Sequence, residues 1–274
     1  MKQNRILGAL LVVLLMIQPL SVCAENDEFN WSASATMTSN YIWRGLYCGG
    51  LSLQADAEVS YYGFFANMWW NIGASDWAFS EFNPEVDLTI GFSRWGLSVY
   101  YIHMYYFDKY ADGTTSKFFD MKNYAPGGGG TTGEWRIAYR VSDRIPLSIL
   151  VGCRTFGRDG YLDENGELKR AYSSYIELGY DFAMKENWAL LLRLGMTPAK
   201  SLYTGFQGNF AVHHIGAKLT KTWQLGNGEN NPNMTAFAHV MLNPWQVNKD
   251  NLVLPVVTAG DQKLNFAVGC AVSL

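Results

Sequence analysis

Apolar and polar residues alternate with a period of two along most of the chain. Between Leu51 and Tyr61, the odd positions are apolar or aromatic and the even positions are mostly polar. The segment 264–274 repeats the pattern, with apolar residues at even positions and small or polar residues between them. This period places successive side chains on opposite faces of a β-strand. The pattern therefore predicts strands with one apolar and one polar face.

We predict about twelve such strands, so the chain belongs to the all-β class. Their ranges are 31–45, 51–61, 64–74, 83–93, 97–107, 132–142, 147–156, 172–183, 188–197, 210–223, 233–243 and 261–274. The connections alternate in length: short turns such as 62–63 and 94–96 are followed by long polar stretches such as 108–131 and 157–171. This order is typical of an up-and-down antiparallel barrel that crosses a bacterial outer membrane, with both chain ends on the periplasmic side.

The composition agrees with a transmembrane barrel. Charged or strongly polar residues interrupt every later apolar stretch, so no segment after the N-terminus predicts a membrane-spanning helix. In hydrocarbon, unpaired backbone groups cost several kcal/mol each, so a spanning sheet has to close on itself. The chain also holds 10 Trp, 16 Tyr and 15 Phe. Tryptophans fall near predicted strand ends, where indole rings favour the membrane–water boundary; they are Trp31, Trp95, Trp188 and Trp223 at the periplasmic ends and Trp77, Trp135 and Trp245 at the external ends.

The first residues predict export from the bacterial cytoplasm. Lys2 and Arg5 precede the apolar run Leu7–Ile17, and the small-residue stretch Ser21–Ala24 follows it. A basic region, a short apolar core and a small-residue cleavage site form a secretory signal peptide. We therefore predict a signal peptide over residues 1–24 and one β-barrel domain over residues 25–274, located in the outer membrane of a Gram-negative bacterium.

Two stretches near the start resemble a known family. Thr38–Gly45, with Trp43-Arg44-Gly45 at its centre, is similar to the opening motif of the TorF-like porin family (the Gcw_chp type), although Asn40 stands where Asp is usual. Tyr62–Trp69 resembles the family's glycine–aromatic strand. The matches cover about the first quarter of the chain. The resemblance implies an outer-membrane barrel with pore activity.

The alternation assigns a set of titratable side chains to the lumen. They are Arg44, Asp56, Glu58, Glu85, Asp87, Glu134, Arg136, Arg140, Arg154, Glu177, Asp181, Arg193, His214 and Lys218. Acidic residues gather on neighbouring strands, and arginines gather on others. Such walls would create a transverse field that sets solute selectivity in a water-filled pore. We expect a porin-like channel for passive diffusion and ion transport of small hydrophilic solutes. The alternative is a structural barrel plugged by its own charge pairs, since twelve strands give a lumen of intermediate width.

An outer-membrane lipid-modifying enzyme is a second alternative. It would need a nucleophile and a base within hydrogen-bond reach, and no short motif links a serine to any of the four histidines. His213 and His214 are adjacent, so regular alternation would place one ring on each face of a strand. We therefore predict no enzyme activity, no catalytic residues, no metal site and no cofactor.

The net charge and the longest loop bear on the expected partners and on the width of the lumen. A net charge of −3 gives no reason to expect nucleic acid. The expected partners are outer-membrane lipid and small hydrophilic solutes, with a monomer as the default. The longest loop, 108–131, is either external or folded inward as a constriction anchored by Phe118, Phe119, Met121 and Tyr124.

Overall fold

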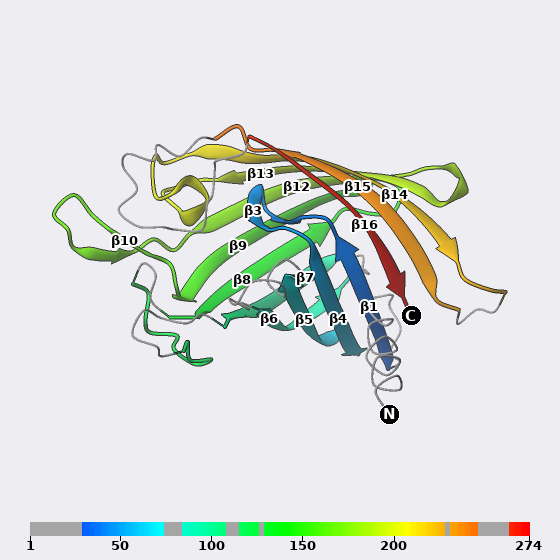
Figure 1. Ribbon diagram of the computed structural model, residues 1–274, viewed down its shortest axis with the longest axis horizontal. Coiled ribbons are helices and arrows are strands. Elements are labelled where there is room, and N and C mark those ends of the chain that lie inside the picture. Colours follow the sequence, from blue (N-terminus) through cyan, green and yellow to red (C-terminus); the bar gives the residue numbers. More distant parts are fainter. Residues whose placement is uncertain (1–28, 74–83, 108–114, 126–128, 228–230, 246–262) are drawn as a thin grey trace, which may run out of the picture.

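The structure is a computed structural model that describes residues 29–73, 84–107, 115–125, 129–227, 231–245 and 263–274. Twelve antiparallel strands form a closed barrel (Figure 1). They are β1 (Asn30–Thr38), β4 (Ser52–Tyr61), β5 (Phe64–Gly73), β6 (Glu85–Arg94), β7 (Leu97–Tyr106), β8 (Thr131–Arg140), β9 (Leu147–Gly157), β12 (Ser174–Ala183), β13 (Trp188–Thr197), β14 (Ala211–Gln224), β15 (Asn233–Leu242) and β16 (Leu264–Ser273). The predicted all-β, twelve-stranded antiparallel barrel is confirmed. The predicted signal peptide, residues 1–24, lies outside the described residues.

The sheet closes through the first and last strands. Strand β1 pairs with β4 along its whole length, from Asn30↔Ser60 to Thr38↔Ser52. Its other edge pairs with β16, from Ser34↔Ser273 to Thr38↔Gly269. Each barrel strand therefore has a hydrogen-bonded neighbour on both sides, which removes the free edges that an open sheet would expose.

The two ends of the barrel differ in their connections. At one end lie short turns and both termini of the barrel; two of these turns place Tyr62-Gly63 and Trp95-Gly96 at positive φ. Such pairs form the tight hairpin turns whose twist matches that of antiparallel strands. The opposite end holds the longer connections and the small hairpin β10 (Gly160–Leu162) with β11 (Leu168–Arg170). Two 3-10 turns, η1 (Lys185–Asn187) and η2 (Leu202–Thr204), complete the elements. None of the helical segments among the described residues has the length and hydropathy needed to span a membrane.

The segment predicted as a single strand, 31–45, is not one strand. Strand β1 ends at Thr38, and the chain then forms a separate hairpin from β2 (Tyr41–Trp43) and β3 (Leu46–Gly49). Arg44 and Gly45 form its tip with φ of 49° and 83°. In Figure 1 this blue hairpin lies between the wall formed by β4 to β7 and the wall formed by β12 to β15. We call it the lumen hairpin.

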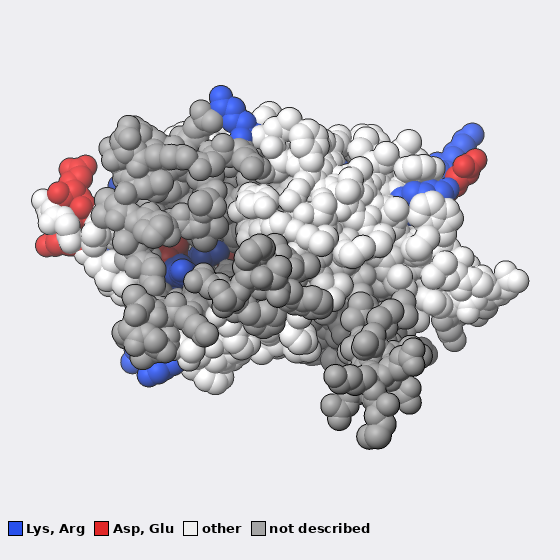
Figure 2. All heavy atoms as spheres, in the orientation of Figure 1, with Lys and Arg blue, Asp and Glu red and all other residues white. Residues whose placement is uncertain are grey.

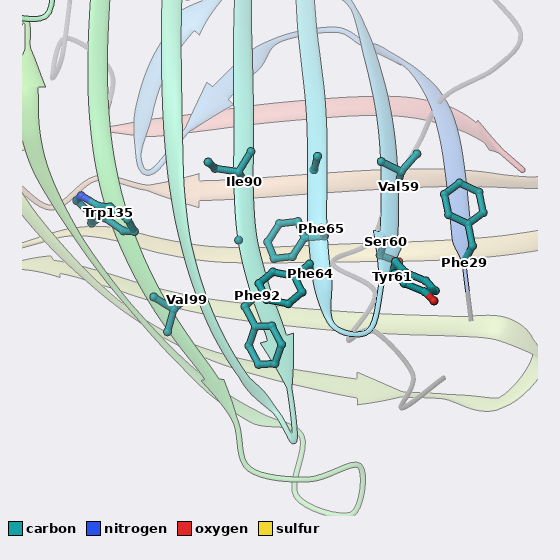
Figure 3. Close-up of a pocket in the computed structure, with 12 residues that line it drawn as sticks. Phe29, Val59, Ser60, Tyr61, Phe64, Phe65, Ile90, Phe92, Val99 and Trp135 are labelled. Atoms are coloured by element: carbon teal, nitrogen blue, oxygen red, sulfur yellow. The ribbon is translucent and has the colours of Figure 1, made fainter. Parts of the chain in front are cut away.

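The two faces of the wall differ in polarity. On β6, Ile90 is 63% exposed whereas Thr89 and Asp87 are buried inside the barrel. Figure 3 shows the apolar outer face over β4 to β8, where Val59, Phe64 and other side chains border a shallow depression of about 570 Å³. In Figure 2 the described charged side chains gather toward the two ends of the molecule, and the described surface between them is uncharged.

The tryptophans are distributed differently from the prediction at one position. Trp31 is the second residue of β1, Trp188 begins β13, Trp223 lies next to the end of β14, and Trp95 lies in a turn, all at the end with short connections. Trp135 was expected near an external strand end, but it lies in the middle of β8 on the outer face. Trp77 lies outside the described residues.

Candidate functional site in the barrel lumen

The lumen hairpin carries Arg44 into the centre of the barrel. Its guanidinium donates two hydrogen bonds to the Glu134 carboxylate on β8, at 2.9 Å and 2.7 Å. It lies 4.0 Å from the ring centroid of Tyr175 and 4.7 Å from that of Trp43. It also donates a 2.5 Å hydrogen bond to the Tyr203 hydroxyl. A two-point ion pair between aromatic faces holds a planar cation in one orientation.

The tip of the hairpin packs against the opposite wall. The backbone carbonyl of Arg44 contacts Nδ1 of His213 at 3.1 Å. The His213 ring is stacked on Tyr203 of η2, with centroids 4.8 Å apart and planes 3° apart. Leu46 of the hairpin joins Tyr203 and Leu202 in a buried cluster. The hairpin and η2 together therefore fill the lumen on the side of the long connections.

Glu134 accepts bonds from more than one arginine. Arg136 donates to the same carboxylate at 2.5 Å, and Arg154 Nε lies 4.0 Å from it. Glu134 is fully buried, and charge-assisted hydrogen bonds offset the cost of removing such a carboxylate from water. Nearby, Tyr41 of the hairpin donates to Glu85 on β6 at 3.0 Å. The hairpin is thus bound to both the acidic and the basic side of the lumen.

A second charged cluster lies on β8, β12 and β13. Arg193 contacts Asp181 at 2.6 Å and Glu177 at 3.5 Å, and Arg140 contacts Asp181 at 3.4 Å. The two acidic side chains lie on β12. Arg193 lies on the adjacent strand β13, and Arg140 lies on β8, which β9 separates from β12. These pairs neutralise most of the charge in this part of the lumen.

Both adjacent histidines are buried within the barrel, which corrects the expectation of one ring on each face. The register between β13 and β14 shifts after Gly195↔His214, because Met196 pairs with Val212 and leaves His213 as the extra residue of a β-bulge. A bulge re-aims side chains out of strict alternation. His214 then contacts the Tyr175 hydroxyl through Nδ1 at 2.9 Å.

The acidic side of the lumen lies on β4 and β6. Asp56 accepts two hydrogen bonds from the Asn67 amide, at 3.1 Å and 3.0 Å. Glu58 follows two residues later on the same face of β4. Asp87 is buried on β6, two residues from Glu85 on the same face. Only β7 separates β6 from the arginine-bearing strands β8 and β9.

A cavity of about 540 Å³ lies beneath the lumen hairpin. Three of the predicted lumen residues border it: Asp56, Asp181 and Lys218. The other predicted residues lie in the two ion-pair clusters or along the acidic wall, apart from His214, which contacts Tyr175. The structure also moves Arg44 from the predicted barrel strand to the hairpin tip, which only the tertiary fold could reveal.

The aromatic residues that hold Arg44 were not predicted from the sequence. Tyr175 lies on the same face of β12 as Glu177 and Asp181. An aromatic residue among inward-facing polar residues was the feature of the sequence that could have indicated its place in the lumen. Trp43 and Tyr203 lie in segments without a barrel strand. Trp43 belongs to the Trp43-Arg44-Gly45 motif, but the motif does not indicate that its ring lies beside the Arg44 guanidinium, and no local pattern marks Tyr203. These two rings lie beside Arg44 only because the lumen hairpin and the connection that contains η2 meet inside the barrel.

The longest loop contributes to the outer surface where it is described. Phe118 packs against the His103 ring, with centroids 4.5 Å apart, and its carbonyl contacts His103 Nε2 at 2.9 Å. His103 pairs with Leu88 on the outward-facing phase of the wall. Phe118 therefore covers the outside of β7, and the constriction comes from the lumen hairpin instead. Within the described parts of the chain, no group of three or more His, Cys, Asp or Glu residues could hold a metal ion.

The fold defines this chain as a closed twelve-stranded antiparallel β-barrel. No protein-family model and no curated protein matches the sequence. Two solved structures are similar in overall arrangement. A NanC porin matches with a TM-score of 0.44 and 9% identity, over 89% of this chain and 99% of that chain. A Pseudomonas aeruginosa FadL homologue matches with a TM-score of 0.34 and 9% identity, over 89% of this chain and 87% of that chain. Scores this low carry no conclusion about a shared function.

Proposed function

We propose that the protein is a bacterial outer-membrane channel for the passive diffusion of small hydrophilic solutes. The observation that supports this most is the division of the closed wall into an apolar outer face and a polar, charged inner face. A wall of this kind satisfies its backbone internally and presents only its apolar side to lipid. The outer face in Figure 3 is of this type, with Phe64 66% exposed and Ile90 63% exposed.

Strand length supports a membrane location. Most barrel strands have 10 residues, which corresponds to about 33 Å of extended chain and, at a tilt of about 40°, to about 25 Å along the barrel axis. This matches the apolar band of about 25 Å that outer-membrane barrels present to lipid. The barrel strands are therefore long enough by themselves to cross the apolar layer of an outer membrane.

The lumen hairpin makes the channel narrow. Arg44, Glu134 and Tyr203 are nearly inaccessible to solvent at the side of the long connections, whereas the cavity beneath them has a volume of about 540 Å³. We propose that the charged walls set selectivity in the open part of the lumen, with Asp56 and Glu58 favouring cations. The position of the hairpin also favours a second candidate, a closed structural barrel in which the hairpin never leaves.

Planar-bilayer conductance tests both candidates. Discrete conductance steps are expected for the refolded protein and not for boiled protein. Replacing Asp56 with Asn and Glu58 with Gln together should lower the cation preference, because both carboxylates lie on one wall of the lumen. Asp143→Asn, in an exposed turn, is the control and should leave selectivity unchanged. A heat-modifiable, inserted barrel without conductance would contradict the channel and favour the closed barrel.

An enzyme receives no support from the histidine contacts that the structure describes. His103 and His213 contact backbone carbonyls, and His214 contacts a tyrosine. A nucleophile activated by histidine has to give its proton to the ring, but the Tyr175 hydroxyl beside His214 donates its hydrogen to Glu177. His103 holds the long loop, His213 holds the hairpin and η2, and His214 contacts Tyr175 of β12.

A further inference from the structure

The cavity beneath the lumen hairpin has a physical origin. Several inward-facing residues of β1 and β16 are small, among them Ser34, Ala267 and Ala271. The lumen beside these strands is therefore empty, whereas longer side chains fill it beside the other strands. The hairpin residues Tyr41 and Ile42 border the cavity on the side of the long connections. We call this space, of about 540 Å³, the vestibule. A volume of this size is within the range of small-molecule sites.

One cation in the vestibule lacks a counter-ion. The Lys218 ammonium lies 4.3 Å from the ring centroid of Phe237, and no described residue forms an ion pair or hydrogen bond with it. Asp181 differs, because Arg193 and Arg140 already neutralise it. An ammonium that lies against an aromatic face retains its three N–H donors. Lys218 is therefore available to an anionic group.

One anion in the vestibule also lacks a counter-ion. Asp56 accepts hydrogen bonds from the neutral Asn67 amide alone among the described residues. It lies on β4, and the strands β1, β16 and β15 separate it from Lys218 on β14. Trp69 is the cross-strand neighbour of Asp56 and also borders the vestibule. Each charge is thus accompanied by an aromatic ring, and small residues lie between them.

We infer that the vestibule binds small zwitterions such as amino acids and short peptides, with the carboxylate at Lys218 and the ammonium at Asp56. A zwitterion satisfies both charges at once, whereas a neutral solute satisfies neither and a simple anion is repelled by the acidic wall. The apolar part of the solute contacts Trp69 and Phe237. This inference rests on the proposed function only for the route by which the solute enters, and it names the solute class of the channel.

Isothermal titration calorimetry on the refolded barrel in detergent micelles tests the inference. The probe is the dipeptide glycyl-leucine, compared with its N-acetylated form and its C-terminal amide, which each remove one charge. The free dipeptide is expected to bind and each modified form to bind about tenfold more weakly, the loss of one charge pair. These comparisons use the unaltered protein, so they do not depend on the folding of any variant. Equal binding of all three forms would overturn the inference.

Two substitutions then locate the site. Lys218→Met and Asp56→Asn should each weaken dipeptide binding about tenfold. Lys221→Met is the matched control, because Lys221 lies on the same strand but near the outward-facing rings of Trp188 and Trp223; it should leave binding unchanged. Binding that neither substitution alters, or no binding at all, contradicts the site. Conductance is measured separately: binding without conductance would contradict the channel alone, and conductance without binding would contradict this inference alone.

Discussion

At the scale of single residues, the chemistry of the lumen centres on Glu134. This one carboxylate binds Arg44 from the hairpin and Arg136 from its own strand, and it lies 4.0 Å from Arg154. A buried ion pair often adds little net stability compared with an apolar pair of the same shape. Removal of one partner, however, leaves an uncompensated buried charge and is strongly destabilising. Glu134 therefore couples the folding of the lumen to the position of the hairpin.

Glu134→Gln tests this coupling. The substitution keeps the size of the side chain but leaves three arginines without their shared anion, so a loss of about 3–5 kcal/mol of folding stability is expected. Thermal unfolding of the barrel in detergent measures it. Glu167→Gln, which affects an exposed pair with Lys169, is the control and should cost less than about 1 kcal/mol. Similar unfolding temperatures for both variants would contradict a structural role for the Glu134 cluster.

At the scale of elements, the lumen hairpin depends on close backbone approach at its tip. Gly45 has a φ of +83°, and a Cβ atom there would lie 2.3 Å from the His213 carbonyl oxygen. A side chain at this position is therefore excluded both by the backbone conformation and by the opposite wall. Only glycine lets the hairpin reach β14.

Gly45→Ala is expected to displace the hairpin and enlarge the conductance of single channels. Gly166→Ala is a matched control, because Gly166 also has a positive φ of 75° but meets nothing within 4 Å. Gly166→Ala places a side chain at a positive φ, as Gly45→Ala does, but its Cβ atom does not collide with a neighbouring residue. The conductance of this variant should equal that of the unaltered protein. Unchanged conductance in Gly45→Ala would show that the hairpin does not limit the pore.

The register of β4 gives a second prediction at this scale. Val59 is on the outer face and Ser60 on the inner face of the strand. Val59→Arg should impair insertion, since an arginine facing lipid costs up to about 2–4 kcal/mol near the membrane centre and less near the interface. Ser60→Arg should be tolerated. The shift in gel mobility between boiled and unboiled samples measures insertion, and equal tolerance of both substitutions would contradict the register.

The elements also mark where prediction from sequence worked and where it failed. The barrel strands were predictable because most of them follow period-two alternation between an apolar outer face and a polar inner face. The lumen hairpin continues the same alternation directly after β1, so residues 39–45 were assigned to the wall. Local periodicity cannot distinguish a strand in the wall from a strand inside the barrel. His213 was misassigned for a related reason, because its bulge arises only from pairing with β13.

At the scale of the whole molecule, closure leaves none of the twelve described barrel strands with a free edge. Strand β1 is bonded to β4 on one side and to β16 on the other. An open sheet would need a partner to satisfy its edges in a membrane, but a closed one does not. The barrel can therefore span a bilayer as a single copy.

A monomer is the expected state in detergent. Analytical ultracentrifugation with matched solvent density gives the mass of the protein part alone, which should equal one chain of 30.8 kDa less any cleaved signal peptide. The measurement should not change over a hundredfold range of protein concentration. A stable dimer or trimer would contradict the monomer and would point to the apolar outer depression over β4 to β8 as its interface.

The strand class, the strand number, the alternation of short and long connections, and the face of most wall residues could all be predicted from the amino-acid order. These properties follow from local periodicity, which each segment has independently of the others. The three-dimensional fold was needed to show that one connection enters the lumen, that Arg44 contacts Glu134, and that Lys218 and Asp56 border one vestibule. Those contacts join residues 90 or more positions apart, and they depend on barrel closure and on the small residues that leave space inside it.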